Sequence, residues 1–475
     1  MVLIRGRWAA ALVVVASITG ALSVPGQAAA SPIATPADFN GDGYRDVALP
    51  APAATVSGKK GAGAVVVLYG SANRVSAQKR VVITQDTAGV PGAAEREDFF
   101  GAATALADLN MDGYADLVVG TPFEDNGTTE DAGTVTVLWG GRNGLSKATT
   151  LPTPAAEGAY YGLDVAAYPQ GKTFARVLVG GWHGSVHYGG PFGTSAAPGG
   201  APSLVQNDLF TPSLAHVALG DVDGDMKPER VLSTVRLGGR SGGDVLVNHD
   251  PNASYAPQQG GDGLVAAVGD INGDGYGDLV AGDPDDGHTT AADGSLGGRI
   301  SIWYGSSTGV SANSNPVRID QSTSGVPGTA ERGDDFGSSL AVTDLNRDGL
   351  ADIVVGAPGE AIGTKTYAGA VTVIPGRSSG ALGTGAYTIT QDTQNVPGGS
   401  ESDDEFGSSL SAGDVNKDGR PELIIGGGGE DGYRGAVWVL PGGTSGPATN
   451  GTVMITANSL GLKGESIYLG ADTGN

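Results

Sequence analysis

The feature that most constrains this chain is a nine-residue acidic turn that recurs along it. Its five close copies are "DFNGDGYRD" (38–46), "DLNMDGYAD" (108–116), "DINGDGYGD" (270–278), "DLNRDGLAD" (344–352) and "DVNKDGRPE" (414–422). A weaker copy, "DVDGDMKPE", stands at 221–229. Recurrence at such intervals predicts a fold built from one small unit used many times.

Short apolar runs bounded by glycine flank each acidic turn, as in "GAVVVLYG" (63–70), and they predict strands between tight turns. A further unit at 160–181 has these runs without the acidic turn, and Asp164 stands at its first turn position. Seven units therefore follow one another at intervals of 49 to 74 residues, which leaves room for four short strands each. This pattern predicts an all-β, seven-bladed β-propeller over residues 31–475.

The two ends of the repeat array suggest how the ring closes. The first unit begins directly at its acidic turn, whereas the last segment, "KGESIYLGAD" (463–472), resembles the strand that precedes the turn in the other units. We therefore predict that the C-terminal strand completes the first blade and leaves the ring without an open edge. With 0 Cys among 475 residues, no disulfide contributes to this closure.

Residues 1–30 read as a secretory signal peptide. Arg5 and Arg7 precede an apolar run at 8–24 and the small residues at 28–30, which predicts cleavage before Ser31. An uncleaved N-terminal anchor is the alternative. We expect a secreted, extracellular protein with no transmembrane anchor after signal cleavage.

The oxygen-bearing side chains of the acidic turn predict calcium binding. Side chains at positions 1, 3 and 5 point at one centre and repel one another unless a cation fills it. Ca²⁺ takes 6 to 8 oxygens from side chains, a backbone carbonyl and water, and glycine at position 6 permits the sharp turn. Mg²⁺ fits less well because it requires a smaller, more rigid octahedron. The alternative is a metal-free turn that caps a hairpin through side-chain hydrogen bonds.

About five calcium sites follow, each with side-chain ligands at positions 1, 3, 5 and 9 and a carbonyl ligand at position 7. The predicted ligands are Asp38, Asn40, Asp42, Tyr44 and Asp46; Asp108, Asn110, Asp112, Tyr114 and Asp116; Asp270, Asn272, Asp274, Tyr276 and Asp278; Asp344, Asn346, Asp348, Leu350 and Asp352; Asp414, Asn416, Asp418, Arg420 and Glu422. A sixth site at Asp221, Asp223 and Asp225 stays open, because Met226 replaces the position-6 glycine there.

The net charge of the chain limits the classes of partner that it can bind. The chain has 51 acidic and 27 basic residues, a formal charge of −24, which argues against nucleic acid and anionic membrane surfaces. Three similar connectors, 83–101, 319–337 and 389–407, join one blade to the next and are expected to share one face, where binding loops commonly lie. Duplication of a spacer explains them equally well.

The motifs around the turns resemble the FG-GAP repeat of the N-terminal propeller of integrin α subunits. "FG" occurs at 100–101, 336–337 and 406–407, and "GAP" occurs at 356–358, relaxed to "GTP" at 120–122. The resemblance covers essentially the whole mature chain and also implies seven blades. The long leg domains and membrane span of integrins are not expected here, so receptor signalling is not implied.

Two further motifs, an RGD tripeptide and a pair of histidines, lie outside the acidic turns. "RGD" at 332–334 aligns with "ERED" (95–98) and "ESDD" (401–404) in sister units, which favours an acidic connector over an adhesion motif. His183 and His187 lie four residues apart on an expected strand, where blade packing is favoured over a shared ligand.

The sequence thus favours an exported, non-catalytic binding or adhesion module for a protein or carbohydrate partner. A propeller enzyme, such as a glycan-active lyase or hydrolase with its site at the central channel, is the alternative, since one fold hosts many activities. No catalytic residue is assigned from the sequence.

Overall fold

Short runs of apolar residues form the strands of this protein. In β22 (Ala370–Ile374), with the sequence AVTVI, every residue is buried, as expected of a strand packed on both faces. The computed structural model describes residues 37–170, 174–182, 184–190, 192–193, 203–209, 214–235, 242–249, 255–286 and 294–470. Over these residues the fold is nearly all-β, with two four-residue helices, α1 (Glu430–Tyr433) and α2 (Ala457–Leu460).

The strands form seven antiparallel sheets, here called blades, and pair in chain order within each. Blades 1 to 3 contain β1 (Val47–Ala51), β2 (Ala64–Leu68) and β3 (Arg80–Ile83); β4 (Ala103–Ala107), β5 (Asp116–Thr121), β6 (Thr134–Trp139) and β7 (Lys147–Leu151); β8 (Asp164–Gln170), β9 (Phe174–Gly181), β10 (Gly184–Gly189) and β11 (Ser203–Leu209). Blades 4 and 5 contain β12 (Leu214–Gly220), β13 (Glu229–Val235), β14 (Gly242–Asn248) and β15 (Ala256–Gly263); β16 (Val265–Gly269), β17 (Asp278–Asp283), β18 (Arg299–Trp303) and β19 (Val317–Ile319). Blades 6 and 7 contain β20 (Ser339–Thr343), β21 (Asp352–Ala357), β22 and β23 (Tyr387–Ile389); β24 (Phe406–Gly413), β25 (Glu422–Gly427), β26 (Ala436–Leu440) and β27 (Val453–Thr456).

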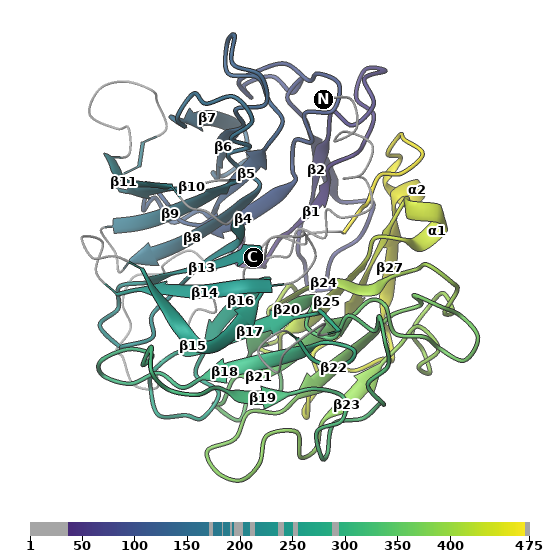
Figure 1. The fold of residues 1–475 in the computed structure, drawn as a ribbon. Helices are drawn as coiled ribbons and strands as arrows, with labels where there is room; N and C mark the ends of the chain where they lie inside the picture. The colour runs from purple at the N-terminus through teal and green to yellow at the C-terminus, as the bar shows by residue number, and fades with distance from the viewer. Residues whose placement is uncertain are drawn as a thin grey trace.

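The blades surround a common centre, which confirms the predicted seven-bladed β-propeller (Figure 1). The first strands of successive blades, β4, β8, β12, β16, β20 and β24, contact one another and are therefore innermost. Because strands alternate in direction, the hairpin after each first strand lies at one face of the ring. The connectors between blades lie at the opposite face, and we call these two faces the turn face and the connector face.

The hydrophobic core lies between neighbouring blades. One cluster joins Val65 and Val67 of blade 1 to Leu117 and Leu138 of blade 2. Another joins blades 5 and 6 through residues such as Ile302 and Ile353, and so each blade is covered by the next one. Stability therefore depends on the ring staying closed.

The C-terminal segment closes the ring at blade 1. In three blades, the glycine of the "FG" position donates its N–H to the second strand: Gly101 to Gly120, Gly162 to Gly180 and Gly337 to Gly356, at 2.9 to 3.0 Å. Gly470 makes the corresponding bond to the carbonyl oxygen of Pro50 at 3.1 Å, and Leu469 before it is fully buried. The tail thus closes the first blade as predicted, although residues 463–470 do so without forming a strand.

Blade 3 requires one correction. The sequence alignment placed Asp164 at the first position of an acidic turn, but Asp164 opens the inner strand β8 and pairs with Gly180, as Ala103 pairs with Gly120 in blade 2. The hairpin of blade 3 falls at 171–173, outside the described residues. The predicted signal peptide and its cleavage site also lie outside the described residues. Within the described part of the chain, no helix is long and apolar enough to cross a membrane.

Candidate metal centre

Six acidic turns lie at the turn face, one in each blade except blade 3. In blades 2, 4, 5, 6 and 7, the residue before position 1 pairs with the position-9 residue across the hairpin, as Ala107 and Asp116 do in blade 2. In blade 1, the N–H of Asp46 donates to the carbonyl oxygen of Ala37 at 2.9 Å instead. The predicted ligands of each site therefore lie on one hairpin. All the acidic side chains of a turn come from the same blade.

Backbone N–H groups orient the carboxylates of each turn. In blade 2, Asp108 accepts from the N–H groups of Asp112 at 3.1 Å and Gly113 at 2.9 Å. The amide oxygen of Asn110 accepts from Asp112 at 3.0 Å, and the carboxylate of Asp112 accepts from Tyr114 at 3.0 Å. These bonds recur in the turns of blades 1, 5, 6 and 7 and fix positions 1, 3 and 5 on one side of the loop.

Position 9 is buried under each turn. Both oxygens of Asp46 accept backbone hydrogen bonds at 2.9 Å, one from Phe39 and one from Gly70. Burial raises the pKa of Asp46 to about 7, and the nearby charges of Asp38 and Asp42 raise it further, against the lowering effect of those hydrogen bonds. Burial likewise raises the pKa of Asp278 to about 7 and that of Asp352 to about 6. A cation in the turn would offset the cost of holding this charge.

Two positions of the turn, not one, require a left-handed backbone. Position 6 has a positive φ throughout, from Gly113 at 92° to Met226 at 65°. Position 4 does too, although it is Met111, Arg347 or Lys417 in three turns. Sequence reasoning missed position 4, and the glycines that occupy it in the other three turns were the available signal. Non-glycine residues at such positions are strained, so the turn is held by its side-chain hydrogen bonds.

Neighbouring turns are linked around the face. The N–H at position 8 of one turn donates to the position-1 carbonyl of the preceding turn, in three pairs: Ala115 to Asp38, Gly277 to Asp221 and Ala351 to Asp270. Between blades 7 and 1, the Lys417 ammonium lies 5.8 Å from the centre of the Tyr44 ring. These contacts link the turns of blades 7, 1 and 2 and those of blades 4, 5 and 6.

The turn of blade 4 brings Asp221, Asp223 and Asp225 together, with carboxylate oxygens within 4.8 Å of one another. It differs from the other turns because Lys227 pairs with Asp225 at 2.6 Å. Burial also raises the pKa of its position-9 residue, Glu229, to about 8. Within the described residues, the carboxylates of the other five turns form no ion pair, and they are not grouped as closely as those of blade 4.

The donor set of these five turns fits a hard divalent cation. It consists of carboxylate and amide oxygens on a tight loop, and the chain has no Cys. Position 3 is Asn in all five, so each turn offers three carboxylates and one amide before any carbonyl or water is counted.

A second repeated acidic feature, missed from the sequence, lies at the connector face. Gln85 donates to Glu124 at 2.6 Å, and the equivalent pairs are Gln321 to Glu360 at 2.5 Å and Gln391 to Glu430 at 2.9 Å. Each pair joins a connector to the blade that follows it. The shared "Q" of the connectors and a Glu 39 residues later were the signal in the sequence.

The RGD tripeptide belongs to this connector structure. The Asp334 side chain is buried and accepts the N–H of Glu331 at 2.6 Å, and Arg332 pairs with Asp286 at 3.5 Å. Asp98 and Asp404 are buried in the same way in the sister connectors. A buried aspartate favours the interpretation as an acidic connector over that as an adhesion motif.

Comparison with known proteins identifies the repeat. The FG-GAP repeat family matches residues 32–68, 100–138, 336–374 and 406–440. This chain carries FG-GAP repeats. The matches fall on blades 1, 2, 6 and 7.

The FG-GAP chain is similar to segments of larger proteins. It is 36% identical over 185 residues to mouse phosphatidylinositol-glycan-specific phospholipase D, covering 38% of this chain and 20% of that protein. It is 34% identical over 231 residues to rat integrin alpha-7, covering 46% of this chain and 18% of that protein. The chain thus spans about a fifth of each of these relatives. It also aligns with the periplasmic gluconolactonase of Pseudomonas aeruginosa at 11% identity and a TM-score of 0.44, over 88% of this chain and 98% of that one.

Proposed function

We propose that this chain is a secreted, calcium-binding propeller of the integrin-alpha type that acts as a non-catalytic binding module for a protein or carbohydrate partner. The observation that carries the proposal is the repetition of one acidic turn in five blades, in each of which the N–H of the position-6 glycine donates to the carboxylate of position 1. FG-GAP propellers of this type generally bind divalent cations, which supports the assignment. Calcium would bind at positions 1, 3, 5, 7 and 9 and hold the turn face closed.

The connector face is the proposed binding surface. Its three similar connectors are held against the following blades by the Gln–Glu pairs, so their outer residues are presented on a rigid support. Exposed side chains there include Arg96 and Glu97 of the first connector. Calcium at the opposite face would act indirectly, by keeping the ring and therefore the connectors in place.

A buried pair of His216 and Asp164 lies on the inner strands, and such a pair could in principle act in catalysis. His216 Nδ1 lies 2.7 Å from the carboxylate of Asp164, and His216 Nε2 lies 3.1 Å from the carbonyl oxygen of Ala266. Both ring nitrogens therefore face oxygens, and the pair links the inner strands of blades 3, 4 and 5. We assign it a structural role.

Two measurements on the secreted chain test the proposal. Titration calorimetry with Ca²⁺ is expected to give about five equivalents, and a glycan array together with immobilised extracellular-matrix proteins is expected to show saturable binding that EGTA abolishes. Combined substitution of Glu95, Arg96 and Glu97 by alanine is expected to weaken that binding without changing calcium stoichiometry. Absence of calcium binding, or turnover of a glycan by the wild-type chain, would overturn the proposal.

A further inference from the structure

The junction between blades 3 and 4 is polar where the equivalent junctions are apolar. In five blades the residue after turn position 9 is a buried apolar residue: Val47, Leu117, Leu279, Ile353 or Leu423. In blade 4 this residue is Arg230, which is 2% exposed. A guanidinium therefore stands at a core position of the repeat.

The cross-strand partner of Arg230 has changed as well. Arg230 pairs in register with Asn248, which is also buried. At the same register position the other blades have Leu68, Leu138, Trp303, Ile374 or Leu440, all of them buried. Two neighbouring apolar positions have thus become polar together.

Blade 3 contributes the opposite wall of this junction. Its strands align with those of blade 2 through the matched bonds of Gly162 to Gly180 and of Gly101 to Gly120. On that alignment His187 occupies the place of the buried Val137, and Arg176 occupies the place of the position-9 carboxylate. At the position where the other blades have a carboxylate, blade 3 therefore has the positively charged side chain of Arg176.

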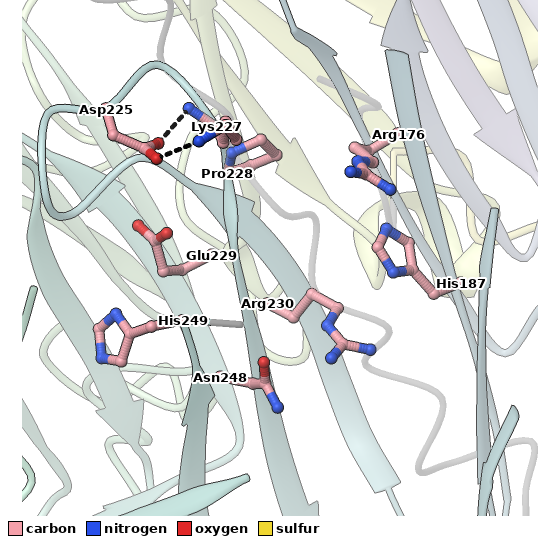
Figure 2. A pocket seen from close by; sticks show the side chains of 9 residues that line it. All are labelled: Arg176, His187, Asp225, Lys227, Pro228, Glu229, Arg230, Asn248 and His249. Atoms are coloured by element: carbon pink, nitrogen blue, oxygen red, sulfur yellow. Dashed lines mark hydrogen bonds and ion pairs between the residues drawn. The ribbon is translucent and has the colours of Figure 1, made fainter. Parts of the chain in front are cut away.

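These four side chains line one cavity of about 260 Å³, together with Asp225, Lys227, Pro228, Glu229 and His249. In Figure 2 the imidazole of His187 lies between the side chains of Arg176 and Arg230. His187 is 4% exposed, and neither of its ring nitrogens has a hydrogen-bond partner among the residues that the structure describes. Burial, and then the charges of Arg230 and Arg176, lower the pKa of His187 to about 3. The neutral ring therefore offers one N–H donor and one acceptor to the cavity.

A buried imidazole without a hydrogen-bond partner is costly to keep in a core. The guanidinium groups of Arg176 and Arg230, which stack over the rings of Phe174 and Tyr255, place positive charge beside it. The sister blades show that this fold accepts apolar residues such as Leu, Val or Trp at the positions of Arg230, His187 and Asn248, so the fold itself does not require polar groups there. Guanidinium groups pair with carboxylate, sulfate and phosphate oxygens through paired N–H donors, which suits an oxyanion. A cavity of this size is smaller than those that hold drug-sized ligands, which indicates a small molecule or a single acidic group.

We propose that the junction between blades 3 and 4 binds a small oxyanion, the carboxylate or the sulfate or phosphate group of a small ligand, between Arg176, His187 and Arg230. Lys227 lies at the mouth of the cavity, where it pairs with Asp225. The site is independent of the connector face and of any calcium in the five regular turns. It explains why the repeat is broken in blades 3 and 4 in particular.

The test measures thermal stabilisation and calorimetric binding of the whole secreted chain in saturating calcium chloride. The probes are sodium sulfate and sodium glucuronate, with sodium chloride at equal ionic strength and uncharged glucose as references. The variants are Arg230→Leu and His187→Val, which install the residues of sister blades and are therefore expected to fold. Arg142→Leu removes the same charge from an exposed position outside both proposed binding surfaces, and is the matched control.

Wild type and Arg142→Leu are expected to bind sulfate or glucuronate more tightly than chloride. Arg230→Leu is expected to bind these anions about tenfold more weakly or worse. His187→Val is expected to weaken binding as well. Binding of sulfate alone would assign a sulfate or phosphate ligand, and binding of glucuronate alone would assign a carboxylate. The proposal fails if neither anion binds the wild type, or if Arg230→Leu and His187→Val bind as the wild type does.

Discussion

The backbone N–H of Ala115 donates a hydrogen bond to the carbonyl oxygen of Asp38 at 3.0 Å, and so joins the acidic turn of blade 2 to that of blade 1. The bonds from Gly277 to Asp221 and from Ala351 to Asp270 do the same in blades 4 to 6. Each bond fixes the position-1 residue, whose carboxylate organises the rest of its turn. The order of one turn therefore supports the order of its neighbour.

Chelation of calcium is expected to lower the melting temperature by many degrees. With a dissociation constant of about 0.1 mM, as in extracellular modules, each of five sites adds about 1.4 kcal/mol at about 1 mM free calcium, or about 7 kcal/mol together. Calorimetry in EGTA with Mg²⁺ supplied, against the same buffer with Ca²⁺, measures the difference. Identical melting curves in the two buffers would rule out a stabilising role for calcium.

Asp274→Asn is expected to remove one calcium equivalent. The Asp274 carboxylate accepts the N–H of Tyr276 at 3.0 Å, and an amide oxygen keeps that bond while the charge is lost. Stability in calcium is expected to fall by about 1 kcal/mol. In EGTA it is expected to stay equal or rise, because repulsion within the turn is reduced. Asp431→Asn, an exposed carboxylate outside the turns, is the control, and equal losses in both variants would contradict the prediction.

Met226→Gly is expected to stabilise the protein by about 1 kcal/mol. Met226 has a φ of 65°, which an L-residue adopts at a cost, and its side chain is largely exposed. Met226→Ala removes the same side chain but keeps the Cβ atom, and is expected to give no such gain. Urea denaturation of the three proteins distinguishes these outcomes, and equal stability of the Gly and Ala variants would show that backbone strain is not the cause.

Glu430→Gln is expected to reveal the pH dependence of the connector clusters. Burial, and then the charge of Asp404, raise the pKa of Glu430 to about 7, above its ordinary value. A raised carboxyl pKa means that the folded protein holds a proton that the unfolded chain releases, so stability is lost as the pH rises toward 7. The glutamine variant resembles the protonated form at every pH.

At about pH 8 the Glu430→Gln variant is therefore expected to exceed the wild type by on the order of 1 kcal/mol, after solvent screening. The difference should vanish as the pH falls to the ordinary range of a glutamate, about 4.5. Denaturation in saturating calcium across this range measures it. Glu465→Gln, whose side chain is 92% exposed, is the control and should show no such trend. A Glu430→Gln difference that does not change with pH would contradict the assigned pKa.

Leu469→Ala is expected to weaken ring closure. Leu469 is fully buried in the cluster that joins blade 7 to blade 1, and the loss of a buried leucine costs about 2 to 5 kcal/mol. Thermal denaturation and limited proteolysis, with cleavage expected near blade 1, measure the effect. Leu296→Ala, an exposed leucine, should leave both unchanged, and a wild-type melting curve for Leu469→Ala would exclude the tail from closure.

The sequence by itself determined the number of blades, the strand-turn-strand unit and the composition of the five regular turns. These are local properties, because a short run of apolar residues and the spacing of Asp38, Asn40 and Asp42 act within one hairpin. The left-handed position 4 was missed because Met111 and Lys417 are unusual there, and only the finished turn shows what holds them. For the same reason the sequence analysis placed Asp164 in a turn, although Asp164 is the first residue of the inner strand β8.

Only the tertiary structure decided which residues of different blades lie next to one another. The contact of Gly470 with Pro50 and the placing of Arg176, His187 and Arg230 around one cavity join residues that are tens to hundreds of positions apart. Their neighbours are set by the rotation of each blade against the next one. A periodic sequence specifies the unit, but the packing of unequal copies decides which of its core positions become a site.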